Sequence, residues 1–111
     1  MNRALGLLGL CARAGKIQSG EQAAELAIRH GQAHLVLLDG AASQGTRKAF
    51  LNACAHHQIP IRLTSADALG AAIGKPGRKI AVITDGKLAQ KLADMLPEAE
   101  TDGKAAMIHN D

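Results

Sequence analysis

Hydrophobic residues in this chain follow two spacings that alternate along its length. Apolar positions recur every three or four residues in the ranges 2–15, 19–31, 43–57, 65–74 and 85–97, and this spacing predicts helices with one buried face each. The first residues of these ranges are predicted helix caps: Asn2, Ser19, Ser43, Ser65 and Asp85. Short apolar runs at 35–38, 61–64 and 80–84 predict strands, and 16–18 is at most a short strand. Strands that alternate with helices through short turns predict an α/β protein, a three-layer α/β/α sandwich.

The start of the second helix is the most informative of these segments. Ser19 stands three residues before Gln22, and this capping-box spacing predicts that the helix begins at Ser19. Free backbone N–H groups at a helix start attract phosphate groups and polar base edges, and Lys16 is close in the sequence. Because most helix starts bind nothing, the segment is compatible with an anion site and with a simple cap.

Composition narrows the class of protein. The 111 residues suffice for one domain, and its core must be aliphatic because Phe50 is the only aromatic residue. Proteins that hold single-stranded nucleic acid by base stacking need aromatic platforms, so that class is disfavoured. Cys11 and Cys54 occupy apolar helical positions without metal-like spacing, which indicates a reducing, cytoplasmic environment. The apolar run in residues 1–10 is too short to cross a bilayer, and no membrane role is expected.

Charge is distributed unevenly along the chain. Residues 1–93 carry seven more positive than negative charges, whereas residues 94–111 carry four more negative than positive charges. The sequence therefore predicts a basic domain over 1–97 and an acidic, mobile tail over 98–111. A basic body is compatible with a polyanionic partner and also with an ordinary solvated surface.

Residues with catalytic chemistry form no convincing site. The turn after the strand 35–38 enters a helix as a phosphate-binding loop does, but Thr46 and Arg47 stand where such a loop needs Lys and then Ser or Thr. The five histidines lack ligand spacing, Asp85 is explained as a helix cap, and Cys54 has only His57 at helical spacing. The chain is expected to be a non-enzymatic protein without metal or cofactor. A nucleotide-dependent enzyme remains a third interpretation.

The basic residues form a more consistent pattern than the candidate catalytic residues. In a layered α/β/α fold, the loop after Lys16, the turn near Gly40 and the loop 75–79 are hypothesised to lie at one end of the sheet. Arg47 and Lys48 would then lie close by. Together these residues would form a binding surface for a polyanion.

Three separated motifs resemble one known family. They read LLGLCARAGKIQSGEQAAELAIRHGQAHLVLLDGAAS, then NACAHHQIPIR, then LGAAIG followed by RKIAVI. From residue 3 to about residue 96 the chain resembles the kink-turn RNA-binding ribosomal protein superfamily (L-seven-Ae / L-thirty-e), most closely its bacterial YlxQ-like branch. The resemblance implies a sandwich with a four-stranded mixed sheet, no enzymatic activity, and kink-turn-like, ribosomal or riboswitch-like RNA as partner.

The start of the second helix departs from the family's pattern. In the family it reads Gly-x-Asn-Glu-x-x-Lys, and these polar residues contact the sheared G·A pairs of the kink. Here Gly20 matches and Gln22 is a longer amide, whereas Ala23 and Leu26 replace the Glu and the Lys. The resemblance therefore implies contacts that are dominated by the RNA backbone.

The leading hypothesis is a ribosome-associated RNA-binding protein that is a monomer in the cytoplasm. Its expected RNA-binding residues surround the start of the second helix: Lys16, Gly20, Gln22, Arg47, Lys48, Lys75, Arg78 and Lys79. The alternative is a protein-interaction module that has lost kink-turn readout. Such a module would dock on the ribosome or on transcription and translation proteins through the surface around Ala23 and Leu26.

Overall fold

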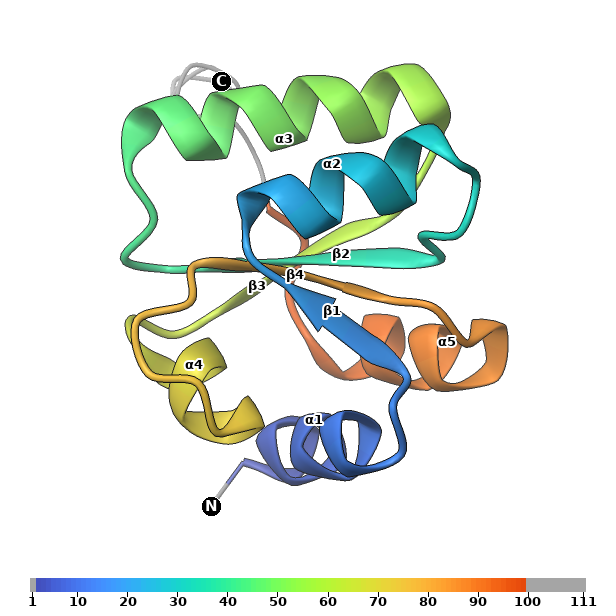
Figure 1. The fold of residues 1–111 in the computed structure, drawn as a ribbon. Coiled ribbons are helices and arrows are strands. Elements are labelled where there is room, and N and C mark those ends of the chain that lie inside the picture. Colours follow the sequence, from blue (N-terminus) through green and yellow to red (C-terminus); the bar gives the residue numbers. More distant parts are fainter. Residues whose placement is uncertain (1, 100–111) are drawn as a thin grey trace, which may run out of the picture.

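The computed structural model describes residues 2–99 and contains, within that range, five helices and four strands (Figure 1). In chain order they are α1 (Arg3–Arg13), β1 (Ile17–Ser19), α2 (Glu21–Arg29), β2 (Leu35–Asp39), α3 (Gln44–His57), β3 (Ile61–Thr64), α4 (Ala68–Ile73), β4 (Ile80–Ile83) and α5 (Gly86–Met95). This order of helices and strands confirms the α/β prediction. None of the helices in residues 2–99 has the length and apolar character needed to cross a membrane.

The strands form one mixed sheet of four strands in the order β1-β4-β2-β3. β2 and β3 are parallel, and β4 is antiparallel to both β1 and β2. The residues that follow β1, β2 and β3 therefore meet the residues that precede β4 at one end of the sheet, which we call the carboxyl end. The starts of α2, α3 and α4 lie there. The residues before β1 and β2 and after β4 lie at the opposite, amino end.

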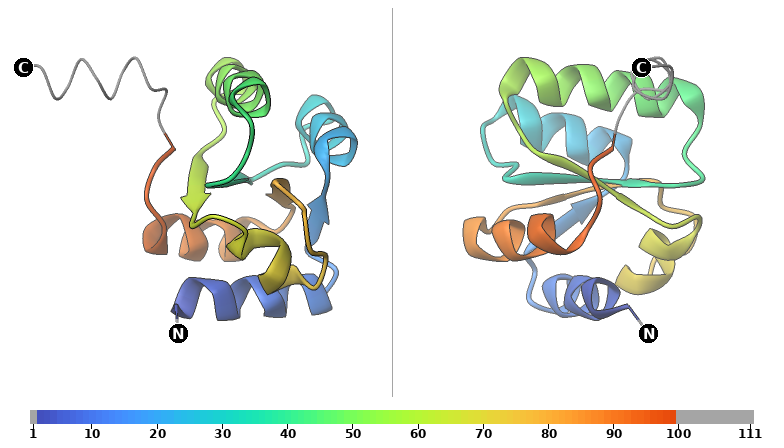
Figure 2. Two further views of the ribbon diagram at one scale, coloured as in Figure 1. Left: turned by 90° about the vertical axis from the view of Figure 1, so that its left-hand side faces the viewer. Right: turned by 180° about the vertical axis from the view of Figure 1, so that it is seen from behind.

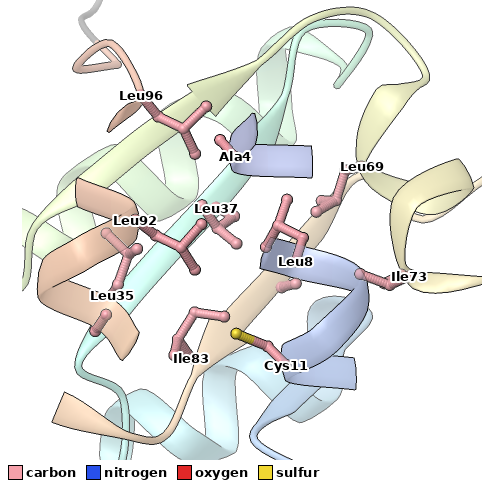
Figure 3. Packing of buried hydrophobic residues seen from close by; sticks show 12 residues of the cluster. Ala4, Leu8, Cys11, Leu35, Leu37, Leu69, Ile73, Ile83, Leu92 and Leu96 are labelled. Atoms are coloured by element: carbon pink, nitrogen blue, oxygen red, sulfur yellow. The ribbon is translucent and has the colours of Figure 1, made fainter. Parts of the chain in front are cut away.

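Helices cover both faces of the sheet and produce the predicted three layers. α2 and α3 lie on one face, and α1, α4 and α5 lie on the other (Figures 1 and 2). β2 is buried along its whole length, and its side chains alternate between the two faces. Leu35 and Leu37 belong to the core on the α1 side, where Figure 3 shows Leu8 of α1 pointing toward Leu37. Val36 and Leu38 belong to the core beneath α2 and α3.

Hydrogen bonds confirm three predicted helix caps. The side-chain oxygens of Asn2, Ser43 and Asp85 each accept a backbone N–H from the first turn of α1, α3 and α5, at 2.7, 3.2 and 3.0 Å. Each bond satisfies a donor that the helix itself leaves unpaired. These starts were predictable because each cap and its partner are only two or three residues apart in the sequence.

Two other predicted caps are wrong. Ser19 is the last residue of β1, and α2 is capped by Gly20 without a side-chain hydrogen bond. The N–H of Gly20 donates to a β4 carbonyl at 2.9 Å, so the strand ladder continues past Ser19 before the chain turns at φ +101°. In the same way α4 begins after Asp67 instead of Ser65, because the N–H of Asp67 donates to Asp39 at 2.7 Å.

The chain after α5 runs along the outer edge of β3. An N–H of β3 donates to the carbonyl of Pro97 at 2.9 Å, and Glu98 forms an isolated antiparallel bridge with β3. Leu96 packs in the core on the α1 side, whereas Ala99 packs in the core beneath α3. The chain therefore passes from one helical layer to the other at this edge.

The predicted acidic tail, residues 98–111, falls mostly outside the described residues. Its first two residues, Glu98 and Ala99, lie against β3. The prediction of mobility covers residues 98–111, of which residues 100–111 lie outside the residues described.

We expect Gly70→Ala in α4 to lower the free energy of unfolding by about 1–3 kcal/mol. A Cβ at Gly70 would lie 2.6 Å from the carbonyl oxygen of Lys75 and 2.9 Å from the nitrogen of Gly77, so backbone would have to move. Gly6→Ala in α1 is the matched control, because a Cβ there would meet no heavy atom within 4 Å. It should stabilise the protein by about 0.5–1 kcal/mol. Urea midpoints that shift in the same direction for both variants would contradict this account.

Candidate nucleic-acid interface

One buried carboxylate joins the loops at the carboxyl end of the sheet. Asp39, the last residue of β2, is fully buried. It accepts four hydrogen bonds, from the N–H groups of Ala41, Asp67 and Leu69 at 2.9, 2.7 and 3.0 Å and from the hydroxyl of Thr64 at 3.2 Å. Burial alone would raise the pKa of Asp39, but the four donors outweigh burial and hold the pKa below its ordinary value. The ionised carboxylate therefore ties the loop after β2 to the loop after β3.

Two glycines let these loops approach each other closely. A Cβ at Gly40, which follows β2, would lie 2.9 Å from the carbonyl oxygen of Thr64 in β3. Gly70 in α4 accepts the N–H of Lys75 at 2.8 Å and leaves no room for a side chain of its own. The loop 74–79 that precedes β4 therefore packs on α4. Glycine is required at both positions because neighbouring backbone occupies the space of a side chain.

The loop before β4 places Arg78 against the start of α2. A Cβ on Gly20 would come within 2.8 Å of Nη1 of Arg78, so the guanidinium lies directly over the glycine backbone. No side chain caps the first N–H groups of α2. A guanidinium and uncapped N–H groups at a helix start both favour a negatively charged partner.

Hydrogen bonds also join the start of α2 to the start of α3. The hydroxyl of Thr46 donates to Oε2 of Glu21 at 2.9 Å, and the hydroxyl of Ser43 donates to Oγ1 of Thr46 at 3.1 Å. The carboxylate of Glu21 therefore links the start of α2 to the start of α3. Its charge also lies in the first turn of a helix, where the helix dipole stabilises it.

Four further predicted basic residues lie at the same end of the sheet. Arg47 of α3 donates to a carbonyl of the β2–α3 turn at 3.4 Å, and Lys79 pairs with Asp67 at 2.7 Å. The hydrogen bond from Asp67 raises the pKa of Lys79. Lys48 and Lys75 are exposed, and neither makes an ion pair with an acid among residues 2–99. The positive residues of this end outnumber its acids, Glu21, Asp39 and Asp67, so its net charge is positive.

Gln22 completes the predicted set at the carboxyl end. It lies exposed in the first turn of α2, one residue after Glu21. An amide at this position can donate and accept hydrogen bonds with a base edge or a ribose.

Lys16 lies at the opposite, amino end of the sheet, so the expectation that it joins the other basic residues is wrong. Its carbonyl accepts the N–H of Thr84 at 2.9 Å. Its charge lies near Asp85, whose pKa is lowered mainly by the N–H of Leu88 and to a smaller extent by Lys16. β1 separates Lys16 from Gly20, because a strand advances about 3.3 Å with each residue.

Sequence reasoning missed the roles of two residues at this end. Neither Asp39 nor Glu21 was among the residues predicted to act at this end. The signal for Asp39 is a carboxylate at the end of a fully apolar run, because a buried charge must find hydrogen-bond donors. No local signal links Glu21 to Thr46.

The structure offers no support for catalysis or nucleotide binding among the described residues. In the turn after β2, Asp39 and Ser43 already accept the N–H groups of Ala41 and Thr46 that a phosphate would need. Burial raises the pKa of the Cys54 thiol to about 12, so it stays neutral. Residues 2–99 contain no group of three His, Cys, Asp or Glu residues that could hold a metal ion.

The chain is similar to known proteins along most of its length. Residues 2–93 match the ribosomal protein L7Ae/L30e/S12e/Gadd45 family. The RNA-binding protein YlxQ of Bacillus subtilis (strain 168) is 40% identical over 91 residues, which cover 81% of this chain and 91% of that protein. The RNA-binding protein YlxQ of Enterococcus faecium is 33% identical over 95 residues, which cover 85% and 91%. The predicted resemblance to this superfamily and its YlxQ-like branch is confirmed.

Solved structures share the fold. A protein of unknown function from Bacillus halodurans has a TM-score of 0.82 at 36% identity, over 86% of this chain and 97% of that one. The Giardia lamblia 15.5kD RNA binding protein has a TM-score of 0.70 at 22% identity, over 83% and 82%, and supports the fold alone. The expectation of a non-enzymatic protein agrees with the family and with the names of both YlxQ relatives.

We expect Asp39→Asn to lower the free energy of unfolding by about 2–4 kcal/mol, because the amide loses the charge and sets its own N–H donors against backbone donors. The lowered pKa of Asp39 means that its contribution to stability is present above the ordinary pKa of 3.8 and is lost as pH falls below it. Urea midpoints between about pH 3 and pH 7 should therefore fall with decreasing pH more steeply for the wild type than for the variant. Asp94→Asn, at an exposed position of α5, is the control. A similar loss in both variants would contradict the role of Asp39.

Proposed function

The chain belongs to the ribosomal protein L7Ae/L30e/S12e/Gadd45 family, and we propose on this basis that it is an RNA-binding protein whose interface is the carboxyl end of the sheet. The observation that carries the proposal is that the start of α2 joins the other two segments there: Arg78 of the basic loop 74–79 lies against it, and Thr46 at the start of α3 is hydrogen-bonded to it. The names of both YlxQ relatives describe RNA-binding proteins, which supports the same class of partner.

The proposed contacts are mainly to the RNA backbone. Arg78 and the uncapped N–H groups of α2 would bind one phosphate, and Lys48 and Lys75 would bind others. Their side chains are exposed, so they can follow an irregular backbone. Backbone contacts of this kind position RNA without reading its sequence.

Gln22 would be the main residue of α2 that contacts the edges of bases. Ala23 is half-buried, and Leu26 is 41% exposed on the same helix. Neither can form the polar contacts that the Glu and Lys of the family motif make with a kink. Glu21 does not replace that Glu, because Thr46 already engages its carboxylate. Recognition of a kink-turn would therefore rely on backbone shape more than on base edges.

We further propose that the protein is cytoplasmic, monomeric and associated with the ribosome. Leu26 also favours a second candidate function, a protein-interaction module, because an exposed leucine at the end of a basic surface can bind an apolar residue of a partner. The two candidates differ in how they respond to nuclease. Capture of ribosomal or transcription proteins that survives nuclease treatment would favour the second.

We expect saturable binding of a kink-turn RNA that weakens roughly 20- to 40-fold between about 50 and 200 mM salt, as about three phosphate contacts would produce. The double variant Lys75→Glu with Arg78→Glu should weaken binding at least about 10-fold and reduce the salt slope by about 2. Fluorescence anisotropy with a labelled RNA measures both quantities.

The matched control reverses the same number of charges on the other layer. Arg3→Glu with Lys91→Glu, on α1 and α5, changes the net charge equally but should leave the salt slope intact. Equal effects of the two double variants on the slope, or no saturable binding at low salt, would refute an interface at the carboxyl end.

We expect the double variant Ala23→Glu with Leu26→Lys to gain kink-turn specificity, because it restores the polar residues of the family motif. The affinity ratio between a kink-turn and the same RNA with Watson–Crick pairs in place of the sheared pairs should rise about 10-fold, or about 1.4 kcal/mol. Ala23→Gln with Leu26→Ala, which restores neither charge, should leave the ratio near its wild-type value. An unchanged ratio in the restored variant would show that α2 does not face the kink.

A further inference from the structure

A second candidate surface lies between α1 and α5, which run side by side on the layer opposite α2 and α3 (Figure 2). A shallow groove of about 500 Å³, open to solvent, lies between the two helices. It is lined by one face of each helix: Arg3, Gly6, Leu7, Leu10 and Arg13 of α1 and Lys91 and Met95 of α5. None of the residues that line the groove belongs to the proposed RNA interface.

The floor of the groove is apolar although it faces solvent. Leu10 is 55% exposed and Met95 is 37% exposed, which places both among the few large hydrophobic residues exposed in residues 2–99. α1 already provides Leu8 and Cys11, both fully buried, to the core. Leu10 adds nothing to that core. An apolar patch rimmed by charged residues is typical of protein interaction sites.

Gly6 keeps the groove open along α1. A Cβ at this position would meet no heavy atom within 4 Å, so no contact inside the described protein requires a glycine. A glycine inside a helix weakens that helix relative to alanine. Its position between Arg3 and Leu10 on the groove face leaves room for a side chain of a partner.

The polar residues of the groove all carry the same charge. Arg3, Arg13 and Lys91 line it, and no acidic residue does. α1 itself contains no Asp or Glu. A second copy of this chain in the same groove would bring these cations together, which disfavours self-association through this face.

We propose that the α1–α5 groove binds an acidic amphipathic helix of a protein partner. Apolar side chains of that helix cover Leu10 and Met95, and its carboxylates pair with the cations at the rim. RNA matches the surface less well, because it offers charge but no aliphatic side chain for the floor. The inference does not rest on the proposed RNA interface.

A defined peptide tests the proposal with the full chain. The probe is a labelled acidic peptide of about 18 residues with leucines at i, i+3, i+4 and i+7 and glutamates on the flanks. A scrambled peptide of equal composition, with its leucines spread around the helix, is the peptide control. We expect saturable binding of the probe in fluorescence anisotropy and at least about 10-fold weaker binding of the scrambled peptide.

Protein variants locate the site. Leu10→Ser with Met95→Ser should weaken binding of the probe at least about 10-fold, and Gly6→Gln should block the groove to a similar degree. Leu26→Ser, an exposed leucine on the other layer, should have no effect. Lys75→Glu with Arg78→Glu should also leave peptide binding unchanged. All these positions are exposed, and thermal midpoints verify that each variant is folded.

Three results would overturn the proposal. Equal binding of the scrambled peptide would show that charge alone attracts the probe. Displacement of the probe by a duplex RNA whose own binding depends on Leu10 would assign the face to nucleic acid. A dimer in sedimentation that Leu10→Ser dissociates would assign it to a second copy.

Discussion

The carboxyl end of the sheet depends on the burial of one charge. Asp39 is an ion in the interior, and such an ion is tolerated only when hydrogen-bond donors surround it. Two of its donors, Asp67 and Leu69, lie 28 and 30 residues further along the chain, and its own N–H donates to the carbonyl of Lys79 at 2.9 Å. The loops after β2 and β3 and the loop before β4 are therefore positioned by one residue. The backbone positions from which the basic side chains of those loops extend are therefore fixed.

The architecture was predictable because the buried residues of the strands and of the helices recur at different spacings in the sequence. β2 is apolar at every position from Leu35 to Leu38 since helices cover both faces, and α1 and α5 show one apolar face each. The errors concern helix starts. Ser19 and Ser65 have the residue types of caps, but hydrogen bonds to the sheet and to Asp39 decide where α2 and α4 begin. A local pattern contains no information about such partners.

The candidate site was predictable only in part for the same reason. The resemblance identified Gly20 and Gln22 at the start of α2, and the sequence identified the basic loop before β4. The contact between Arg78 and Gly20 could not be inferred, because it depends on the pairing of β1 with β4. Lys16 was misplaced because closeness in sequence was taken for closeness in space.

The segment that runs along β3 gives the sheet a protected border. An exposed strand offers unpaired N–H and C=O groups on which other chains can assemble. Pro97 and Ala99 occupy such groups of β3, and β1 at the other border is only three residues long. Aggregation through the sheet is therefore suppressed at both borders by the protein itself. A truncated chain that stops at the end of α5 would lose this protection, even though every residue of the proposed interfaces would still be present.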